Sequence, residues 1–169
     1  MESDWALPHN FKAEQEVLGA VLVDPSVISD SSLEPSDFYS PEHQAIWRMM
    51  LKLHSEGMSI DEVTLTESLS TANVLDHHQC LRVLGSCCDR LGSLSGFSSY
   101  CQIVKDKSVK RSLAAHGMNV NELARSDSPG KLAVEKAETG LQCFLQRNIT
   151  HQLFGFLRSG KSMAEPQDL

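Results

Sequence analysis

The sequence has few aromatic residues and no excess of positive charge. Phe, Trp and Tyr make up 6% of its 169 residues, and 15 Lys and Arg stand against 22 Asp and Glu, giving a formal net charge of −7. A protein that coats nucleic acid needs surplus cations, so we expect no strong direct DNA binding. No apolar run approaches the ~20 residues of a membrane span, and the acidic start MESDWALPHN lacks the regions of a signal peptide. We therefore expect a cytoplasmic protein without a membrane partner.

The sequence also lacks a paired cysteine motif. Its five cysteines are an odd number without a secretion signal, so we expect free thiols. The stretch 77–88 holds His77, His78, Cys80, Cys87 and Cys88, which suggests zinc, but it contains no C-x-x-C pair. On one helix, residues 80 and 87 lie about 10 Å apart along the axis, whereas zinc ligands converge within about 2.0–2.3 Å of the ion. We therefore expect no metal site.

One string does match a catalytic pattern. Residues 155–162 read GFLRSGKS, which satisfies the G-x-x-x-x-G-K-S of a phosphate-binding P-loop. A P-loop works because a strand delivers a glycine-rich turn into a helix N-terminus. Here only MAEPQDL follows, which is too short to build a parallel sheet, and no G-x-S-x-G occurs elsewhere. We interpret the string as a chance match and expect this chain by itself to be no enzyme and to bind no cofactor.

Apolar residues recur at helical spacings, and no alternating run of β-branched residues predicts a strand. Asn10 is placed to cap a helix over about 11–23, whose apolar stripe is Phe11, Leu18, Val21 and Leu22. Asp24-Pro25 and Ser40-Pro41 share another pattern, a capping side chain followed by Pro at the first helical position. The sequence therefore predicts an all-α protein.

Further short helices complete the N-terminal part. The helix after Ser40 carries apolar residues at spacings of three and four, namely Ile46, Met49, Met50 and Leu53. Trp47 is predicted to lie at the edge of this stripe, and Gly57 to follow the end of the helix. Asp61 is placed to cap another helix, and one more is expected over about 76–86. The stretch GSLSGFSS at 92–99 is typical of a loop. These segments predict a compact head of about five to six helices.

Two longer helices follow, one from about 97 to 124 and one after the break RSDSPG at 125–130. Both carry apolar residues at spacings of three and four: Val109, Leu113, His116, Val120 and Leu123, then Val134, Ala137, Leu141 and Phe144. Two such stripes joined by a short turn predict an αα-hairpin that packs on itself or on a second copy. Gly117 and Gly140 each cost roughly 1 kcal/mol relative to Ala, which indicates either reliance on a partner or a close helix crossing.

Two polar features of the first long helix have structural interpretations. Its basic cluster consists of Lys105, Lys107, Lys110 and Arg111. We interpret this cluster as a solvated helix face, with a phosphate or protein contact as the alternative. His116 lies on the apolar stripe and is interpreted as a packed or edge residue rather than a switch or ligand. Neither feature predicts a catalytic site.

Four segments in this order and spacing resemble one known family: AEQEVLGAVLVDP (13–25), SDFYSPEHQAIWRMMLKL (36–53), IDEVTLTESL (60–69) and YCQIVKDKSVKRSL (100–113). Over about residues 7–147 the sequence is similar to the N-terminal domain of DnaB-type replicative DNA helicases. The resemblance implies an all-α head followed by a helical hairpin. It also implies that hairpins pair the domains into dimers, that three dimers form a collar on the hexameric helicase, and that this region helps recruit the primase. It also implies that ATP and Mg²⁺ belong to a separate C-terminal motor domain.

The resemblance also implies boundaries and residue roles. The head is expected to span residues 7–98. The hairpin is expected to span residues 99–147 and to act as an oligomerisation arm, and residues 148–169 are expected to form an unmatched, flexible tail. Structural roles, with contact to a neighbouring subunit as the alternative, fall to Glu14, Gln15, Leu18, Gly19, Phe38, Tyr39, His43, Ile46, Trp47, Thr64 and Leu65. The self-association face is predicted to comprise Val109, Leu113, Val120, Val134, Ala137, Leu141 and Phe144. His77-His78 stand where the family commonly has Gly-Gly, so either the turn differs or the histidines are helical.

From this resemblance we expect an oligomerisation and protein-docking module of DNA replication. It would form a dimer or higher ring, or insert into the collar of a host helicase, with a replicative helicase, primase or helicase loader as candidate partners. The alternative is a remnant or fragment of an ATP-dependent helicase whose motor domain lies outside these residues. The unmatched ending after residue 147 favours an independent or frameshifted end over a cut helicase. A small metal or nucleotide enzyme is the third, disfavoured hypothesis.

Overall fold

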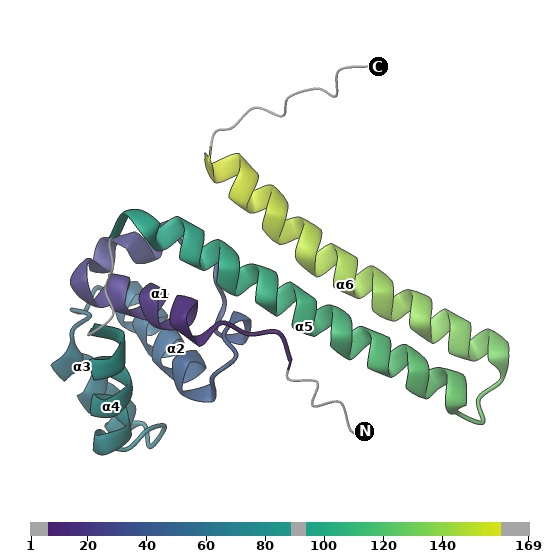
Figure 1. Ribbon diagram of the computed structural model, residues 1–169, viewed down its shortest axis with the longest axis horizontal. Helices are drawn as coiled ribbons and strands as arrows, with labels where there is room; N and C mark the ends of the chain where they lie inside the picture. The colour runs from purple at the N-terminus through teal and green to yellow at the C-terminus, as the bar shows by residue number, and fades with distance from the viewer. Residues whose placement is uncertain (1–6, 89–93, 160–169) are drawn as a thin grey trace. The chain divides into compact units, whose positions relative to one another are not determined.

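The computed structural model describes residues 7–88 and 94–159, with side chains described up to residue 146. All regular structure within these ranges is helical, which confirms the predicted all-α class. The chain divides into two compact units, Met1–Arg111 and Ser112–Leu169, which we call the head and the hairpin unit. The division falls inside one long helix, α5 (Phe97–Arg125) (Figure 1). The predicted domain boundaries after residues 98 and 147 stay predictions.

The head is built from short helices that pack around one core. α1 packs against α2 and α4, and α3 packs against the same two helices (Figure 1). In chain order the described elements of the head are α1 (Phe11–Val23), η1 (Pro25–Asp30), η2 (Pro35–Asp37), α2 (Pro41–Ser55), α3 (Glu62–Thr71), α4 (His77–Cys88), η3 (Leu94–Gly96) and the first part of α5.

The predicted capping residues begin the helices of the head. The side chains of Asn10, Ser40 and Asp61 each accept a hydrogen bond from the backbone N–H three residues later, at 3.1, 3.4 and 2.8 Å. These bonds satisfy donors that the first turn of a helix leaves without an intrahelical partner. Gly57 follows the end of α2 with a φ of +67°, a conformation that glycine adopts without steric cost.

The histidine pair opens α4 rather than forming a turn. Asp76 accepts a hydrogen bond from the Gln79 N–H at 2.8 Å, and the Gln79 side chain accepts one from the Asp76 N–H at 3.1 Å. This reciprocal pair is a capping box. His77 and His78 occupy the first two positions of the helix, so the second of the two alternatives holds.

The core of the head differs from the sequence prediction at two aromatic residues. Trp47 is fully buried, and its indole N–H donates to the Leu33 carbonyl at 3.0 Å. The edge position predicted for Trp47 is wrong, because Leu33 and Phe38 cover a side of α2 that helical periodicity alone leaves open. Phe11, predicted on the buried stripe of α1, is 44% exposed and contacts the rings of His9 and Tyr39 instead.

The hairpin unit consists of α5 from Ser112 onward and α6 (Gly130–Ser159), which run antiparallel (Figure 1). The break between them lies at the predicted RSDSPG stretch. α6 continues through residues 155–159, the first part of GFLRSGKS, while residues 160–162 lie outside the described residues. A P-loop requires a loop at these positions, whereas residues 155–159 are helical; that the chain binds no cofactor stays a prediction.

Candidate functional site

The two helices of the hairpin unit touch at His116 and Gly140. The His116 ring stacks on Phe144 with ring centroids 6.4 Å apart and planes 13° apart. A Cβ at Gly140 would lie 3.1 Å from His116 Cε1, so glycine permits this close approach. Of the two explanations for the helical glycines, close crossing holds for Gly140. It does not hold for Gly117, where an added Cβ would meet no atom within 4 Å.

An exposed apolar stripe on each helix lies beside this contact. Leu113 and Val120 are exposed on α5, and Val134, Leu141 and Leu145 are exposed on α6. Residues seven apart occupy nearly the same angular position on an α-helix, so each stripe follows one side of its helix. We call these five residues the hairpin apolar face: Leu113, Val120, Val134, Leu141 and Leu145.

Both stripes lie on the same side of the hairpin. At about 100° per residue, Leu113 lies roughly 60° clockwise of His116 as seen along α5, and Leu141 lies roughly 60° clockwise of Phe144 as seen along α6. Because the helices are antiparallel, equal rotations of the same sense from the contact bring both stripes to one face. Met118 and Leu132 are exposed too, but the same geometry puts them off this face.

Nothing in the described part of the hairpin unit is fully buried. From Ser112 to residue 146, each described side chain is either exposed or half-buried, although the stretch is rich in leucine, valine and alanine. An exposed contiguous apolar patch on a globular protein marks an interaction site more often than chance. The hairpin apolar face is therefore the candidate functional site of this chain.

The predicted self-association residues divide into three groups. Leu113, Val120, Val134 and Leu141 belong to the hairpin apolar face. Ala137 and Phe144 are half-buried, and Phe144 packs on His116 within the hairpin. Val109 is half-buried and belongs to the head. Leu145 is exposed on the face and was not in the predicted set, although its spacing of four from Leu141 marked it. That these residues mediate self-association stays a prediction.

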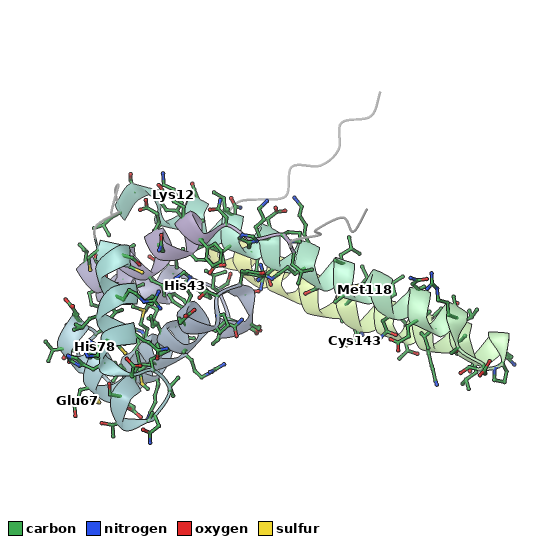
Figure 2. All side chains as sticks on the ribbon, turned by 60° about the horizontal axis from the view of Figure 1, so that its bottom comes forward. Lys12, His43, Glu67, His78, Met118 and Cys143 are labelled. Carbon is green, nitrogen blue, oxygen red and sulfur yellow. The ribbon has the colours of Figure 1, made fainter. Side chains whose placement is uncertain are left out.

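The head contains a buried polar network that joins α1 to the start of α2. Glu14 is 1% exposed, and its carboxylate accepts hydrogen bonds from the Tyr39 N–H at 2.8 Å and the Ser40 N–H at 3.4 Å. His43 Nδ1 lies 2.7 Å from the same carboxylate, inside the head (Figure 2). A buried carboxylate needs such partners to offset its lost hydration. The network therefore ties two segments of the resemblance together.

The basic cluster of α5 is not simply a solvated face. Lys105 Nζ lies 3.0 and 2.8 Å from the two carboxylate oxygens of the buried Asp37. The Arg111 guanidinium donates to the backbone carbonyls of Asp37 and Pro8, and burial lowers the pKa of this residue. The solvated interpretation is therefore wrong for these two residues, because helical spacing does not show which side of α5 meets the head. Lys110 pairs locally with Asp106 at 2.9 Å.

The residues assigned structural roles by the resemblance lie in the interior of the head or next to it. Gln15, Tyr39 and Thr64 are half-buried, and the Gln15 amide donates to the Ser86 hydroxyl of α4 at 3.1 Å. The others are buried: Glu14, Leu18, Gly19, Phe38, His43, Ile46, Trp47 and Leu65.

The thiols and acidic groups of the described residues do not converge. None of the five cysteines is in a disulfide, and burial raises the pKa of the Cys87 thiol to about 12 and that of Cys101 to about 11. Within the described ranges, no three His, Cys, Asp or Glu side chains are close enough together to hold a metal ion. The search of the same ranges for a helix able to cross a membrane found none.

Comparisons with known proteins agree on one domain type. Residues 6–106 match the model of the DnaB-like helicase N terminal domain. The chain is 30% identical over 147 residues to the replicative DNA helicase DnaC of Bacillus subtilis, covering 85% of this chain and 32% of that protein. It is 36% identical over 108 residues to the replicative DNA helicase DnaB of Geobacillus stearothermophilus, covering 63% of this chain and 24% of that protein. The chain thus spans about a third or less of the length of these relatives.

Solved structures match over more of their own length. The N-terminal domain of DnaB helicase from Mycobacterium tuberculosis superposes with a TM-score of 0.74 at 27% identity, covering 81% of this chain and 99% of that one. The N-terminal domain of DnaB helicase from Helicobacter pylori, described with its interactions with primase, gives a TM-score of 0.59 at 25% identity and covers 68% of this chain and 91% of that one. The matched region in these relatives is the N-terminal domain rather than a motor domain. The chain belongs to the family of DnaB-like helicase N-terminal domains.

Proposed function

We propose that this chain is an oligomerisation and protein-docking module of DNA replication, and that the hairpin apolar face joins it to a second copy. The observation that carries the proposal is the exposure of five large apolar residues on one side of a hairpin in which no described side chain is fully buried. Pairing two such faces would remove this apolar surface from water at roughly 25 cal/mol per Å². A dimer is the smallest assembly that does so, and a ring of dimers is the larger one.

Candidate docking partners are a primase, a helicase loader and a replicative helicase. The proposal of primase rests on the H. pylori domain, which is similar to this chain and is described with its interactions with primase. Neither ATP nor Mg²⁺ is needed for a docking role, and we propose that these residues bind neither.

Native mass at micromolar concentration tests the self-association. Val134→Asp with Leu141→Asp should convert the oligomer into a folded monomer, because both side chains are exposed and each substitution adds charge to the proposed contact face. Phe144→Asp is less suitable, since Phe144 stacks on His116 and its loss would also disturb the hairpin. Circular dichroism of the double variant should show unchanged helix content.

Met118→Asp with Leu132→Asp is the matched control. It adds the same charge to the same two helices at exposed positions off the hairpin apolar face, so the oligomer should persist. An oligomer that survives the Val134 and Leu141 substitutions, or a wild-type chain that is monomeric, contradicts the proposed face.

The second candidate function is the N-terminal part of an ATP-dependent replicative helicase. The observation that favours it is that the chain spans only about a third of the length of the B. subtilis relative. The size of the native gene product decides between the two: a product several times larger than 18.7 kDa supports the helicase, and one of this mass supports the separate module.

A further inference from the structure

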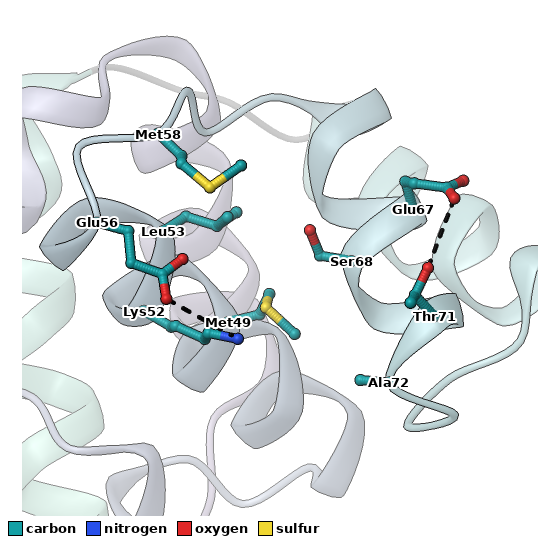
Figure 3. Close-up of a pocket in the computed structure, with 9 residues that line it drawn as sticks. All are labelled: Met49, Lys52, Leu53, Glu56, Met58, Glu67, Ser68, Thr71 and Ala72. Carbon is teal, nitrogen blue, oxygen red and sulfur yellow. Dashed lines mark hydrogen bonds and ion pairs between the residues drawn. The ribbon is translucent and has the colours of Figure 1, made fainter.

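A groove runs between α2 and α3 on the surface of the head. Its volume is about 330 Å³. Met49 and Leu53 of α2 and Met58, just beyond that helix, form one wall, and Ser68 and Ala72 face them from the side of α3 (Figure 3). Leu53 is almost fully buried, whereas Met58 is half exposed. The groove therefore offers an apolar bed that the head does not fill.

Acidic residues outnumber basic ones among the groove-lining residues and in the stretch of sequence that follows Lys52. From residue 53 to residue 81 the sequence contains neither Lys nor Arg, while five acidic residues fall within it: Glu56, Asp61, Glu62, Glu67 and Asp76. Glu56 and Glu67 line opposite sides of the groove (Figure 3). The one lining cation, Lys52, lies 4.0 Å from Glu56, and both side chains are largely exposed. The rim thus presents an excess of negative charge.

We propose that the α2–α3 groove docks a segment of a partner protein that carries an apolar side chain flanked by Lys or Arg. The apolar side chain would rest on Met49, Leu53 and Met58, and the flanking cations would meet Glu56 and Glu67. Methionine suits such a bed because its unbranched thioether adapts to different apolar shapes. Opposite charge on the rim favours basic partners and disfavours acidic ones. An acidic partner segment would meet repulsion from Glu56 and Glu67.

This docking surface is separate from the hairpin apolar face. It lies in the head, is defined by charge as well as by apolar area, and does not depend on self-association. It deepens the docking role proposed above by stating the chemistry of the partner. Its failure would leave the oligomer intact, and failure of the oligomer would leave the groove unchanged.

Two synthetic helical peptides test the proposal. Both carry leucines at spacings of three and four on an alanine background, one with lysines and the other with glutamates at the flanking positions. The protein is labelled with ¹³C at its methionine methyl groups, and Met50, fully buried, and Met118, in the hairpin unit, serve as internal references. The lysine peptide should shift the methyl signals of Met49 and Met58 but not those references, and the glutamate peptide should bind much more weakly.

Charge reversal on α3 supplies the matched control. Glu67→Lys should weaken binding of the lysine peptide about fivefold, whereas Glu62→Lys, an equal change on the same helix outside the groove, should have little effect. The proposal is overturned if the groove methyls do not move, if both peptides bind alike, or if the two variants behave alike. It is also overturned if Met118 moves instead. Shifts of Met49 and Met58 that depend on protein concentration without peptide would assign the groove to a second copy.

Discussion

The head and the hairpin unit use apolar residues in opposite ways. All 23 buried hydrophobic residues of the described chain lie between Ala13 and Val104, and the most C-terminal buried residue of any kind is Ser108. From Ser112 to residue 146 the structure buries no described side chain, although large apolar residues recur there every three or four positions. The head therefore supplies its own core, whereas the hairpin unit leaves its apolar residues available to a partner.

The polar contacts follow the same division. In the head they join segments far apart in sequence, as Glu14 with His43 and Lys105 with Asp37. In the hairpin unit, Ser126, just after the end of α5, donates to the Leu123 carbonyl, and Thr139 donates to the Glu135 carbonyl within α6. Because helices gain most of their stability from tertiary packing of an apolar face, the hairpin should be the less stable part until that face is covered.

The largest expected effect is on the core of the head. Trp47→Ala removes a fully buried ring and its hydrogen bond to Leu33 and should lower the free energy of unfolding by about 3–5 kcal/mol. Leu141→Ala, tested in the Val134→Asp background at a protein concentration where native mass shows a monomer, should cost less than about 1 kcal/mol because the side chain is exposed. Urea unfolding followed by circular dichroism measures both. Equal losses of unfolding free energy for the Trp47 and Leu141 variants would contradict the proposal that the head has its own core and the hairpin unit does not.

The second effect concerns the buried polar network of the head. His43→Leu fills the space of the ring but leaves the Glu14 carboxylate with backbone donors alone, and should cost about 3 kcal/mol. His9→Leu is a suitable control, since His9 is only partly buried and its ring nitrogen contacts the nearby Leu7 carbonyl. Thermal unfolding compares the two. A His43 variant as stable as the wild type would show that the network is not needed for folding.

The third effect is on the reactivity of the thiols. Burial raises the pKa of Cys87 to about 12, so this thiol is almost entirely protonated near pH 8 and should react only when the head unfolds. Cys88 and Cys143 are exposed and should react first. Cys143 lies roughly 160° around α6 from Leu141, so the proposed oligomer leaves it accessible. Mass spectrometry after brief labelling gives the order, and early labelling of Cys87 would contradict the packing of α4.

The raised pKa of Cys87 also predicts how the stability of the head depends on pH. A thiol whose pKa is higher in the folded state than in the unfolded state keeps its proton longer on folding. The free energy of unfolding therefore falls as pH rises above the ordinary thiol pKa toward the raised pKa of the folded state, because the unfolded chain loses the thiol proton first. Cys87→Ala would remove the contribution of Cys87 and leave that of Cys101, so denaturation curves at alkaline pH should show a smaller loss of stability than in the unchanged protein.

The sequence predicted local features better than tertiary ones. Asn10, Ser40 and Asp61 were predictable as caps because capping depends only on residues within one turn. The exposed leucines and valines of the hairpin were predictable for the same reason, since a stripe is a property of one helix. The burial of Trp47 and the turning of Lys105 and Arg111 toward the head were not, because each depends on a segment at a distance in sequence.

The candidate docking groove shows the same limit more sharply. The sequence shows that residues 53–81 contain no Lys or Arg, but it does not show that Met49 and Met58 line one groove with Ala72. That placement depends on how α2 packs against α3, which no periodicity specifies. The Gln79 cap of α4 could have been found, because Asp and Gln three residues apart are a local signature.

The smallest effect separates two glycines of the hairpin unit. Gly117→Ala meets no atom within 4 Å, so it should stabilise the hairpin by roughly 0.5–1 kcal/mol through helix propensity. Gly140→Ala brings a Cβ to 3.1 Å from the His116 ring, so the same gain should be offset by displacement of that ring. Both are compared in the Val134→Asp, Leu141→Asp background, because Gly117 borders the hairpin apolar face. Hydrogen exchange of the α6 amides should slow for Gly117→Ala only; equal slowing in both would show that the helices do not cross closely at His116.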